Sequence, residues 1–256
     1  NLQLRVKTLP KENKPRTTKK THLQLKMKFY IDELPVLFPY PNIYPEQYEY
    51  MCDIKKTLDA GGNSILEMPS GTGKTVSLLS ITIAYQMHYK TETSFRKIIY
   101  CSRTMSEIEK ALIEMNNLMK YRTQELGYEE NFLGLGLTSR KNLCLHPKVK
   151  KERKGTVVDE KCRRMTNGQA RKRKEENPDL DIELCNFHDN MYNMNVDEYL
   201  PNGVYSFEKL IDICEEKTIC PYFTVRRMIG LANIIIYSYH YILDPKIAER
   251  VSEQMN

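Results

Sequence analysis

No stretch of this sequence contains the roughly 20 consecutive apolar residues that a membrane-spanning helix needs. The most apolar stretch, residues 231–243, is interrupted by Asn233, Ser238 and His240. No secretory leader is recognisable either, because residues 1–26 are rich in Lys, Thr and Pro and contain no apolar core. We therefore expect a soluble protein with no membrane partner, in which residues 1–26 form a disordered basic extension.

The sequence also lacks any pair of cysteines separated by two residues, although it contains seven cysteines. This absence excludes the spacing of standard zinc fingers and of ferredoxin-type clusters. With no recognisable leader we expect a reducing compartment, where spaced cysteines bind metals more often than they form disulfides. Spacing alone leaves open whether the cysteines of residues 141–222 bind a metal or are structural, and two histidines keep a zinc site open. The residues concerned are Cys144, Cys162, Cys185, Cys214, Cys220, His146 and His188, whereas Cys52 and Cys101 are expected to be ordinary core residues.

Positive charge is concentrated in two parts of a chain whose net charge is +6. Residues 1–28 hold nine Lys and Arg against one Glu, and residues 140–174 hold fourteen against three acids. The rest of the chain is therefore acidic. Basic residues gathered in this way favour nucleic-acid phosphates as a partner. A run of charge can also be no more than a solvated face.

Outside residues 141–222, apolar residues recur with the periods of alternating strands and helices. Expected strands are residues 64–68, 97–101, 135–138 and 234–237, and expected helices are residues 48–59, 74–87 and 106–120. The prolines within residues 27–47 predict an extended segment before the first helix. This alternation predicts an α/β fold in which a parallel sheet is covered by helices. Residues 141–222 lack the alternation and hold five of the seven cysteines, so we interpret them as an inserted subdomain.

A phosphate-binding loop is predicted where the first expected strand gives way to a helix, in the run Met68-Pro69-Ser70-Gly71-Thr72-Gly73-Lys74-Thr75. The loop departs from the commonest form of this motif at Met68, where that form has Gly. Gly71 and Gly73 allow backbone N–H groups to converge on phosphate oxygens at the positive end of the following helix. Lys74 is expected to reach the β- and γ-phosphates of ATP, and the Thr75 hydroxyl to coordinate Mg²⁺. We therefore predict nucleotide binding by residues 68–75, with Lys74 and Thr75 as catalytic residues.

ATP hydrolysis also needs an apolar strand that ends in Asp-Glu, which holds Mg²⁺ and positions the attacking water. The sequence contains no convincing motif of this kind. Residues 157–160 and 196–198 contain Asp-Glu pairs but end no apolar strand, and Asp244 is followed by Pro245 and lacks the Glu. The sequence by itself therefore predicts nucleotide binding without a complete hydrolytic site.

Four features together resemble the XPD family of superfamily-two DNA helicases. They are the loop at residues 68–75, the run Tyr100-Cys101-Ser102-Arg103-Thr104, the cysteine-containing region and the run Tyr237-Ser238-Tyr239-His240-Tyr241. The resemblance extends from Met27 essentially to the end of the sequence. It implies a RecA-like P-loop NTPase motor domain 1 whose first part is residues 27–140, an inserted 4Fe-4S subdomain at residues 141–222, and a return into the motor domain at residues 223–256. It also implies an amino-terminal fragment that stops before the Asp-Glu-Ala-His motif of the family and is inactive alone.

The resemblance implies a role for particular residues. Cys144, Cys162, Cys185 and Cys220 match the family's ligands of a [4Fe-4S] cluster, with Cys214 as a spare. Gln47 is the expected polar contact to adenine, and Arg103 and Arg140 are expected contacts to DNA. The basic residues Arg163, Arg164 and Arg171 to Lys174 are further candidates along the DNA path.

The implied function is an ATP-dependent 5′ to 3′ DNA helicase of nucleotide-excision repair and transcription initiation, acting in the nucleus as a subunit of TFIIH. Its implied cofactors are ATP, Mg²⁺ and a [4Fe-4S] cluster, and its implied partners are single-stranded and forked DNA and other TFIIH subunits. Two alternatives remain open from the residues alone. One is another P-loop NTPase or kinase, and the other is a non-enzymatic module that binds zinc and nucleic acid.

Overall fold

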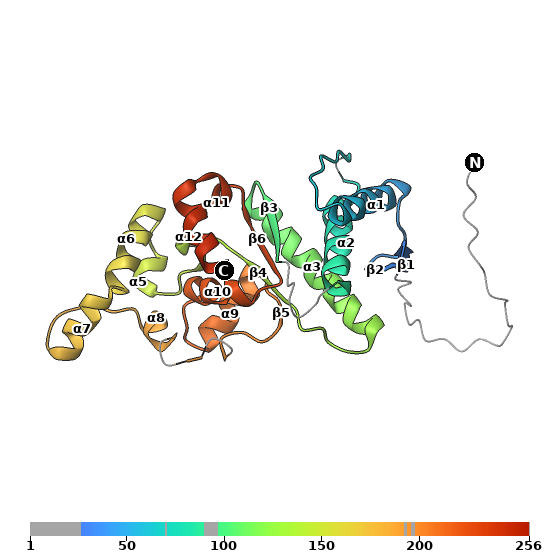
Figure 1. Ribbon diagram of the computed structural model, residues 1–256. Helices are drawn as coiled ribbons and strands as arrows, with labels where there is room; N and C mark the ends of the chain where they lie inside the picture. The colour runs from blue at the N-terminus through green and yellow to red at the C-terminus, as the bar shows by residue number, and fades with distance from the viewer. Residues whose placement is uncertain (1–26, 70, 90–96, 192–193, 196–197, 256) are drawn as a thin grey trace, which may run out of the picture.

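A parallel sheet forms the centre of the protein (Figure 1). The computed structural model describes residues 27–69, 71–89, 97–191, 194–195 and 198–255, so the extension expected at residues 1–26 lies outside it. Within the described residues the sheet has four strands in the order β3, β6, β4, β5. These are β3 (Ile98–Ser102), β6 (Ile234–Ser238), β4 (Leu133–Gly136) and β5 (Gly203–Val204), and each neighbouring pair is parallel. The predicted α/β fold with a parallel sheet is confirmed.

Strand β6 is buried on both faces of the sheet. Ile234 and Ile236 pack in a core with the long helices α2 (Lys74–His88) and α3 (Met105–Leu126). Ile235 and Tyr237, which alternate with them, join a second core with α9 (Phe207–Glu216), α10 (Pro221–Met228) and α12 (Pro245–Met255). Because successive side chains of a strand point to opposite faces, a strand covered on both sides reads as an unbroken apolar run.

Helix α3 extends beyond the predicted residues 106–120. It begins at a capping box and ends at a left-handed glycine. The Thr104 side chain accepts a hydrogen bond from the Glu107 backbone N–H at 3.3 Å, and the Glu107 carboxylate accepts one from the Thr104 N–H at 3.2 Å. This reciprocal pair is a capping box, which starts a helix. At the other end Gly127 has a φ of 77°, the left-handed conformation that ends many helices.

The proline-rich segment before the first helix is a hairpin and not a single extended run. Strands β1 (Met27–Ile31) and β2 (Leu34–Phe38) pair antiparallel. Helix α1 (Pro45–Asp59) then begins three residues earlier than predicted. Proline is well suited to the first helical position because the N–H that it lacks would have no partner there.

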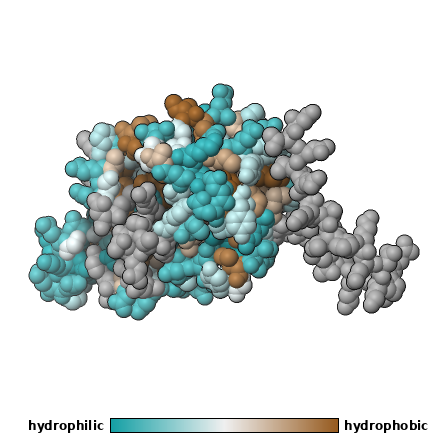
Figure 2. Space-filling view, turned by 45° about the vertical axis from the view of Figure 1, so that its right-hand side comes forward, coloured by the Kyte–Doolittle hydropathy of each residue, from teal (hydrophilic) through white to brown (hydrophobic). Residues whose placement is uncertain are grey.

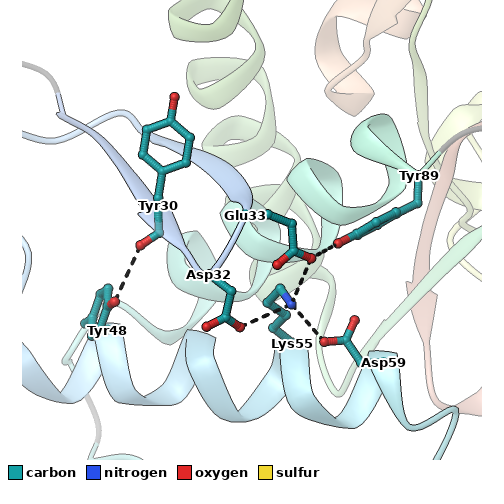
Figure 3. A network of polar contacts seen from close by, with 7 residues as sticks. All are labelled: Tyr30, Asp32, Glu33, Tyr48, Lys55, Asp59 and Tyr89. Carbon is teal, nitrogen blue, oxygen red and sulfur yellow. Dashed lines mark hydrogen bonds and ion pairs between the residues drawn. The ribbon is translucent and has the colours of Figure 1, made fainter.

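A buried lysine fastens the hairpin to α1 and α2 (Figure 3). The Lys55 side chain is 4% exposed, and its Nζ lies 2.8 Å from Asp59, 3.3 Å from Asp32 and 3.4 Å from Glu33. The Tyr89 hydroxyl, just after α2, donates a hydrogen bond to Glu33. Asp32 and Glu33 form the turn of the hairpin, so this network joins the hairpin and two helices into one unit.

The predicted strand at residues 64–68 is wrong. Residues 62–69 have no regular secondary structure, and Ile65 is fully exposed. Apolar periodicity shows that a segment can form a strand, but a strand also needs a neighbour to pair its backbone groups. Within the described part of the chain, neither sheet includes these residues.

The first part of the region predicted as an insert consists of short helices, and its later part contains β5 of the central sheet and α9. The short helices are α4 (Arg140–Leu143), α5 (Pro147–Lys150), α6 (Gly155–Met165), α7 (Gly168–Glu176) and α8 (Asn186–Asn190). Outside this region, the 3₁₀ turn Ile229–Leu231 precedes β6, and α11 (His240–Leu243) and α12 follow it. A small core of Val149, Val158, Met165 and Cys185 holds this part together. Helix α7 buries none of its residues and lies at one end of the molecule in Figure 1, and Figure 2 shows that end as hydrophilic. Among the described residues, no helix is both long and apolar enough to cross a membrane.

Candidate functional site

The predicted phosphate-binding loop leads into the N-terminus of α2. Gly71 and Gly73 have φ values of 82° and 79°, which are left-handed and which side-chain-bearing residues rarely adopt. Gly73 is the N-cap of α2, so the backbone N–H groups at the start of this helix are free to meet an anion. Ser70, also predicted to bind nucleotide, lies outside the described residues.

The side chains of the loop are held by its own backbone. Lys74 Nζ donates to the carbonyl oxygens of Met68 at 2.8 Å and Pro69 at 2.9 Å, and the Thr72 hydroxyl donates to Pro69 at 2.7 Å. The Thr75 hydroxyl hydrogen-bonds Tyr100 on β3. The bond to Tyr100 holds the start of α2 beside β3, and ligands of open α/β folds bind at the carboxyl edge of the sheet.

Gln47, which is expected to contact the adenine, lies against the loop. Its side chain is buried, and its Oε1 accepts a hydrogen bond from the Tyr44 N–H at 2.9 Å. Its Nε2 is so near Gly73 that a Cβ there would lie 2.4 Å from it. A side chain at this position would displace the Gln47 amide, and the left-handed φ of Gly73 also favours glycine.

The loop opens onto a pocket of about 650 Å³. One wall is the loop, a second is the aromatic segment between β2 and α1, and a third is the exposed face of α3. The third wall, made by Lys110, Ile113 and Glu114, is absent from the sequence-based prediction. The sequence contained a signal for this wall, because these residues fall between the apolar positions of α3 that we assigned to the core and therefore lie on its other face.

Charge effects act between the four cysteines predicted to bind a cluster. Beside burial, the charge of Cys162 raises the pKa of Cys144, Cys185 and Cys220, whereas Cys214 hydrogen-bonds Thr224. Burial raises the pKa of all four, and that of Cys220 to about 12. Within the described residues, no three His, Cys, Asp or Glu side chains are arranged as they stand to hold a metal ion.

Donors around these thiols oppose the effect of burial. Backbone N–H groups lower the pKa of three of them: His146 acts on Cys144, Phe187 and His188 on Cys185, and Tyr222 and Phe223 on Cys220. The guanidinium of Arg140 does the same for Cys162. Cys185 and Cys220 also precede the first residues of α8 and α10. Donors of this kind stabilise sulfur that carries negative charge.

The two arginines predicted to contact DNA have different surroundings. Arg103 is exposed just after β3, and its backbone N–H donates to Glu107 at 3.1 Å. Arg140 is largely buried: its Nη1 lies 3.4 Å from Asp159, and its guanidinium lies 4.2 Å from the centre of the Tyr222 ring. DNA binding by Arg140 stays a prediction.

Of the further basic candidates, Arg163, Arg164, Lys172 and Arg173 are exposed, whereas Arg171 and Lys174 are partly buried and hydrogen-bonded to Asp189 and Leu180. His146 is half-buried, and its Nδ1 has no hydrogen-bond partner among the described residues. His188 is buried and contacts Arg171.

Comparison with known proteins identifies the family. The DEAD_2 family model matches residues 100–256, more than half of the sequence. The chain belongs to the DEAD_2 family. The matched part of this DEAD_2 chain begins within β3 and contains the cysteine region, and the phosphate-binding loop precedes it.

Curated relatives match a larger part of this DEAD_2 chain. The general transcription and DNA repair factor IIH helicase subunit XPD/RAD3 of Saccharomyces cerevisiae is 77% identical over 230 residues, which are 90% of this chain and 29% of that protein. The corresponding subunit XPD of Schizosaccharomyces pombe is 60% identical over 90% of the chain and 29% of its own length. The human regulator of telomere elongation helicase 1 is 27% identical over 86% of the chain and 19% of its own length. The chain thus spans less than a third of each of these relatives, and its resemblance to XPD helicases is confirmed.

Proposed function

We propose that the protein is an ATP-dependent DNA helicase of 5′ to 3′ polarity that acts in the nucleus as a subunit of TFIIH, in nucleotide-excision repair and transcription initiation. The observation that supports ATP binding is the contact of Gln47 with Gly73 at the N-terminus of α2, beside a pocket of about 650 Å³. The 77% identity to a TFIIH helicase subunit supports the rest of the proposal.

In this proposal residues 68–75 bind the phosphates of ATP. Lys74 exchanges the carbonyl oxygens of Met68 and Pro69 for the β- and γ-phosphates, and its charge stabilises the negative charge of the transferred group. The Thr75 hydroxyl would coordinate Mg²⁺ when the nucleotide is bound, and Gln47 would contact the adenine. Of the Asp-Glu candidates, residues 157–160 lie on α6 and Asp244 follows α11, and neither lines the pocket. Residues 196 and 197 lie outside the described part of the chain.

Residues 141–222 are proposed to form a subdomain between two parts of the motor domain, residues 27–140 and 223–256. Cys144, Cys162, Cys185 and Cys220 would hold a [4Fe-4S] cluster, which when bound would link their four segments through Fe–S bonds. The convergence of N–H and guanidinium donors on these four thiols supports this assignment, because ligated sulfurs are negatively charged.

Single-stranded and forked DNA are the proposed polymer substrates, and other TFIIH subunits the protein partners. Arg103, Arg140 and the exposed basic residues of α6 and α7 are the proposed phosphate contacts. Such contacts would bind DNA without regard to sequence and would weaken as salt rises.

ATPase activity stimulated by single-stranded DNA tests the proposal in the full-length protein. We expect Lys74→Arg to abolish the stimulated rate with no change in melting temperature, because arginine keeps the charge but not the geometry of lysine. Undiminished hydrolysis by this variant would show that the loop is not the catalytic site. Stimulation by a small-molecule acceptor in place of DNA would favour a kinase.

Metal analysis with a visible absorption spectrum tests the cluster on anaerobically purified protein. We expect broad visible absorbance and about four irons per chain, both lost in Cys144→Ser and retained in Cys214→Ser. Zinc without colour would instead favour the zinc-binding module, with His146 as a ligand to be tested.

A further inference from the structure

The α3 wall of the nucleotide pocket contains a hydrogen bond that the proposed function does not use. The Tyr40 hydroxyl donates to the Glu114 carboxylate, with distances of 2.7 Å to Oε2 and 3.0 Å to Oε1. Tyr40 belongs to the segment between β2 and α1, which is 74 residues away in the sequence. Both side chains line the same pocket as Gly73 and Lys74. The bond therefore ties two walls of this pocket together.

Tyr40 is placed for this bond by its neighbours. Pro39 and Pro41 restrict the backbone on either side of it. The ring of the buried Phe38 lies 5.9 Å from the Tyr40 ring in an edge-to-face arrangement. Burial, together with the bond to Glu114, raises the pKa of Tyr40 to about 12, so its hydroxyl remains a donor at neutral pH.

The segment that contains Tyr40 also determines where α1 begins. Tyr44 is the N-cap of α1, its N–H donates to Gln47 Oε1, and Gln47 Nε2 lies against Gly73. A segment held at Tyr40 therefore has fewer ways to displace Gln47 from the phosphate-binding loop.

We propose that Glu114 is a positioning residue of the nucleotide site, which acts through Tyr40 to hold the segment between β2 and α1 in the conformation that binds nucleotide. This inference rests on the proposed function, because it assumes that ATP occupies the pocket. It predicts an effect on affinity and not on folding. The Tyr40–Glu114 bond is partly exposed, so it adds little to global stability. It strengthens binding because the segment between β2 and α1 is already ordered and loses less entropy when the ligand binds.

The test is a double-mutant cycle in the full-length protein. Its variants are Glu114→Ala, Tyr40→Phe and the combination, and the readout is the Kd of a fluorescent ATP analogue with Mg²⁺. We expect each single variant to bind about tenfold more weakly, the effect of one charge-assisted hydrogen bond. The combination should be no weaker than either single variant, because both remove the same bond.

Three controls separate positioning from other roles. Glu114→Gln keeps an acceptor for the Tyr40 hydroxyl and should bind nearly as well as the unmodified protein. Glu125→Ala, on the exposed last turn of α3, should change nothing. Melting temperatures and kcat should stay unchanged while the KM for ATP rises with Kd.

Additive effects of the two substitutions, or unchanged affinity, would overturn the inference. So would a Glu114→Gln variant as weak as Glu114→Ala, because the carboxylate would then act directly. If Glu114→Ala does not fold, Tyr40→Phe, which removes a single oxygen atom, decides alone. Lys74→Ala separates the proposed function from the positioning role of Glu114. If Lys74→Ala leaves the affinity for the ATP analogue unchanged, the proposed function fails. If Lys74→Ala weakens binding and Tyr40→Phe does not, only the positioning role fails.

Discussion

Replacement of Gly73 by alanine probes the contact between α1 and the phosphate-binding loop. Gly73 has a φ of 79°, and a left-handed backbone costs alanine about 1–2 kcal/mol. The new Cβ would also lie 2.4 Å from Gln47 Nε2, so Gln47 must move. Its displacement breaks the 2.9 Å hydrogen bond to the Tyr44 N–H, a loss of about 1 kcal/mol. We expect the free energy of unfolding to fall by about 2–3 kcal/mol in total.

The neighbouring glycine supplies a matched control. Gly71 has a φ of 82°, but apart from its chain neighbours no atom of the described residues lies within 4 Å of a Cβ built there. Gly71→Ala should therefore lose only the backbone contribution of about 1–2 kcal/mol. In a protein that already carries Gln47→Ala, the loss caused by Gly73→Ala should fall to the same value, because the obstructing amide is gone.

Urea denaturation of the four variants, with the m-value checked for each, gives the free energies. A fluorescent ATP analogue titrated into the same samples reports whether the loop still binds nucleotide. If Gly73→Ala is no more destabilising than Gly71→Ala, or if Gln47→Ala gives no relief, the contact described here does not exist in solution.

Two other predictions concern stability. The Arg122 guanidinium and the Glu130 carboxylate form a buried two-pronged pair, with contacts of 2.6 and 2.7 Å and both side chains 7% exposed. Glu130→Ala leaves the buried Arg122 charge without its partner and should lower the free energy of unfolding by about 3–5 kcal/mol. The control Glu129→Ala, at an exposed position, should change this free energy little. Equal losses in the two variants would refute the pairing. The pKa of Glu33 is lowered from 4.5 to about 2, chiefly by the hydrogen bond from Tyr89. A carboxylate with a lowered pKa stabilises the folded state above its unfolded pKa and loses that effect as pH falls through its folded pKa. The melting temperature of the unmodified protein should therefore exceed that of Glu33→Gln at pH 6, and this difference should shrink between about pH 4.5 and pH 2; a constant difference would contradict the assignment.

The parts of the fold that were predictable are those in which local pattern and packing agree. Helix α2 was expected at residues 74–87 and spans Lys74–His88, because its apolar residues face the core and a left-handed Gly73 starts it. Strand β6 was expected from Ile234 to Tyr237, and it is buried on both faces. In each case the local signal and the tertiary environment favour the same structure.

The wrong or missed predictions concern segments whose secondary structure depends on pairing with residues distant in the sequence. Residues 64–68 have the composition of a strand, but neither sheet of the described residues includes them. Strand β5 is only two residues long, too short to produce any period, and exists because it pairs with Leu133 and Gly134. The hairpin of β1 and β2 has no glycine or asparagine in its turn, and Asp32 adopts a φ of 51° instead.

The candidate sites show the same division. The run at residues 68–75 could be identified because a phosphate-binding loop is local in sequence. The wall of α3 could not, because Lys110 and Glu114 resemble ordinary solvated residues until the segment between β2 and α1 lies opposite them. For the cysteines, spacing alone left metal binding open. The N–H and guanidinium donors that surround four of them could not be predicted from the sequence, because folding brings them there.

An unbroken series of contacts joins the phosphate-binding loop to the cysteine region. The series is Thr75, Tyr100, Cys101, Tyr237, Tyr241, Arg226, Tyr222, Arg140 and Cys162. It crosses the sheet at β3, where Tyr100 and Cys101 are adjacent in sequence and point to opposite faces. Packed interiors resist deformation, so the strand pairs β3–β6 and β6–β4 hold the first half of the series rigid. The second half depends on two partly buried arginines stacked on one ring, at 3.6 and 4.2 Å. The arginine stack is therefore the part of this series that no strand pairing holds in place.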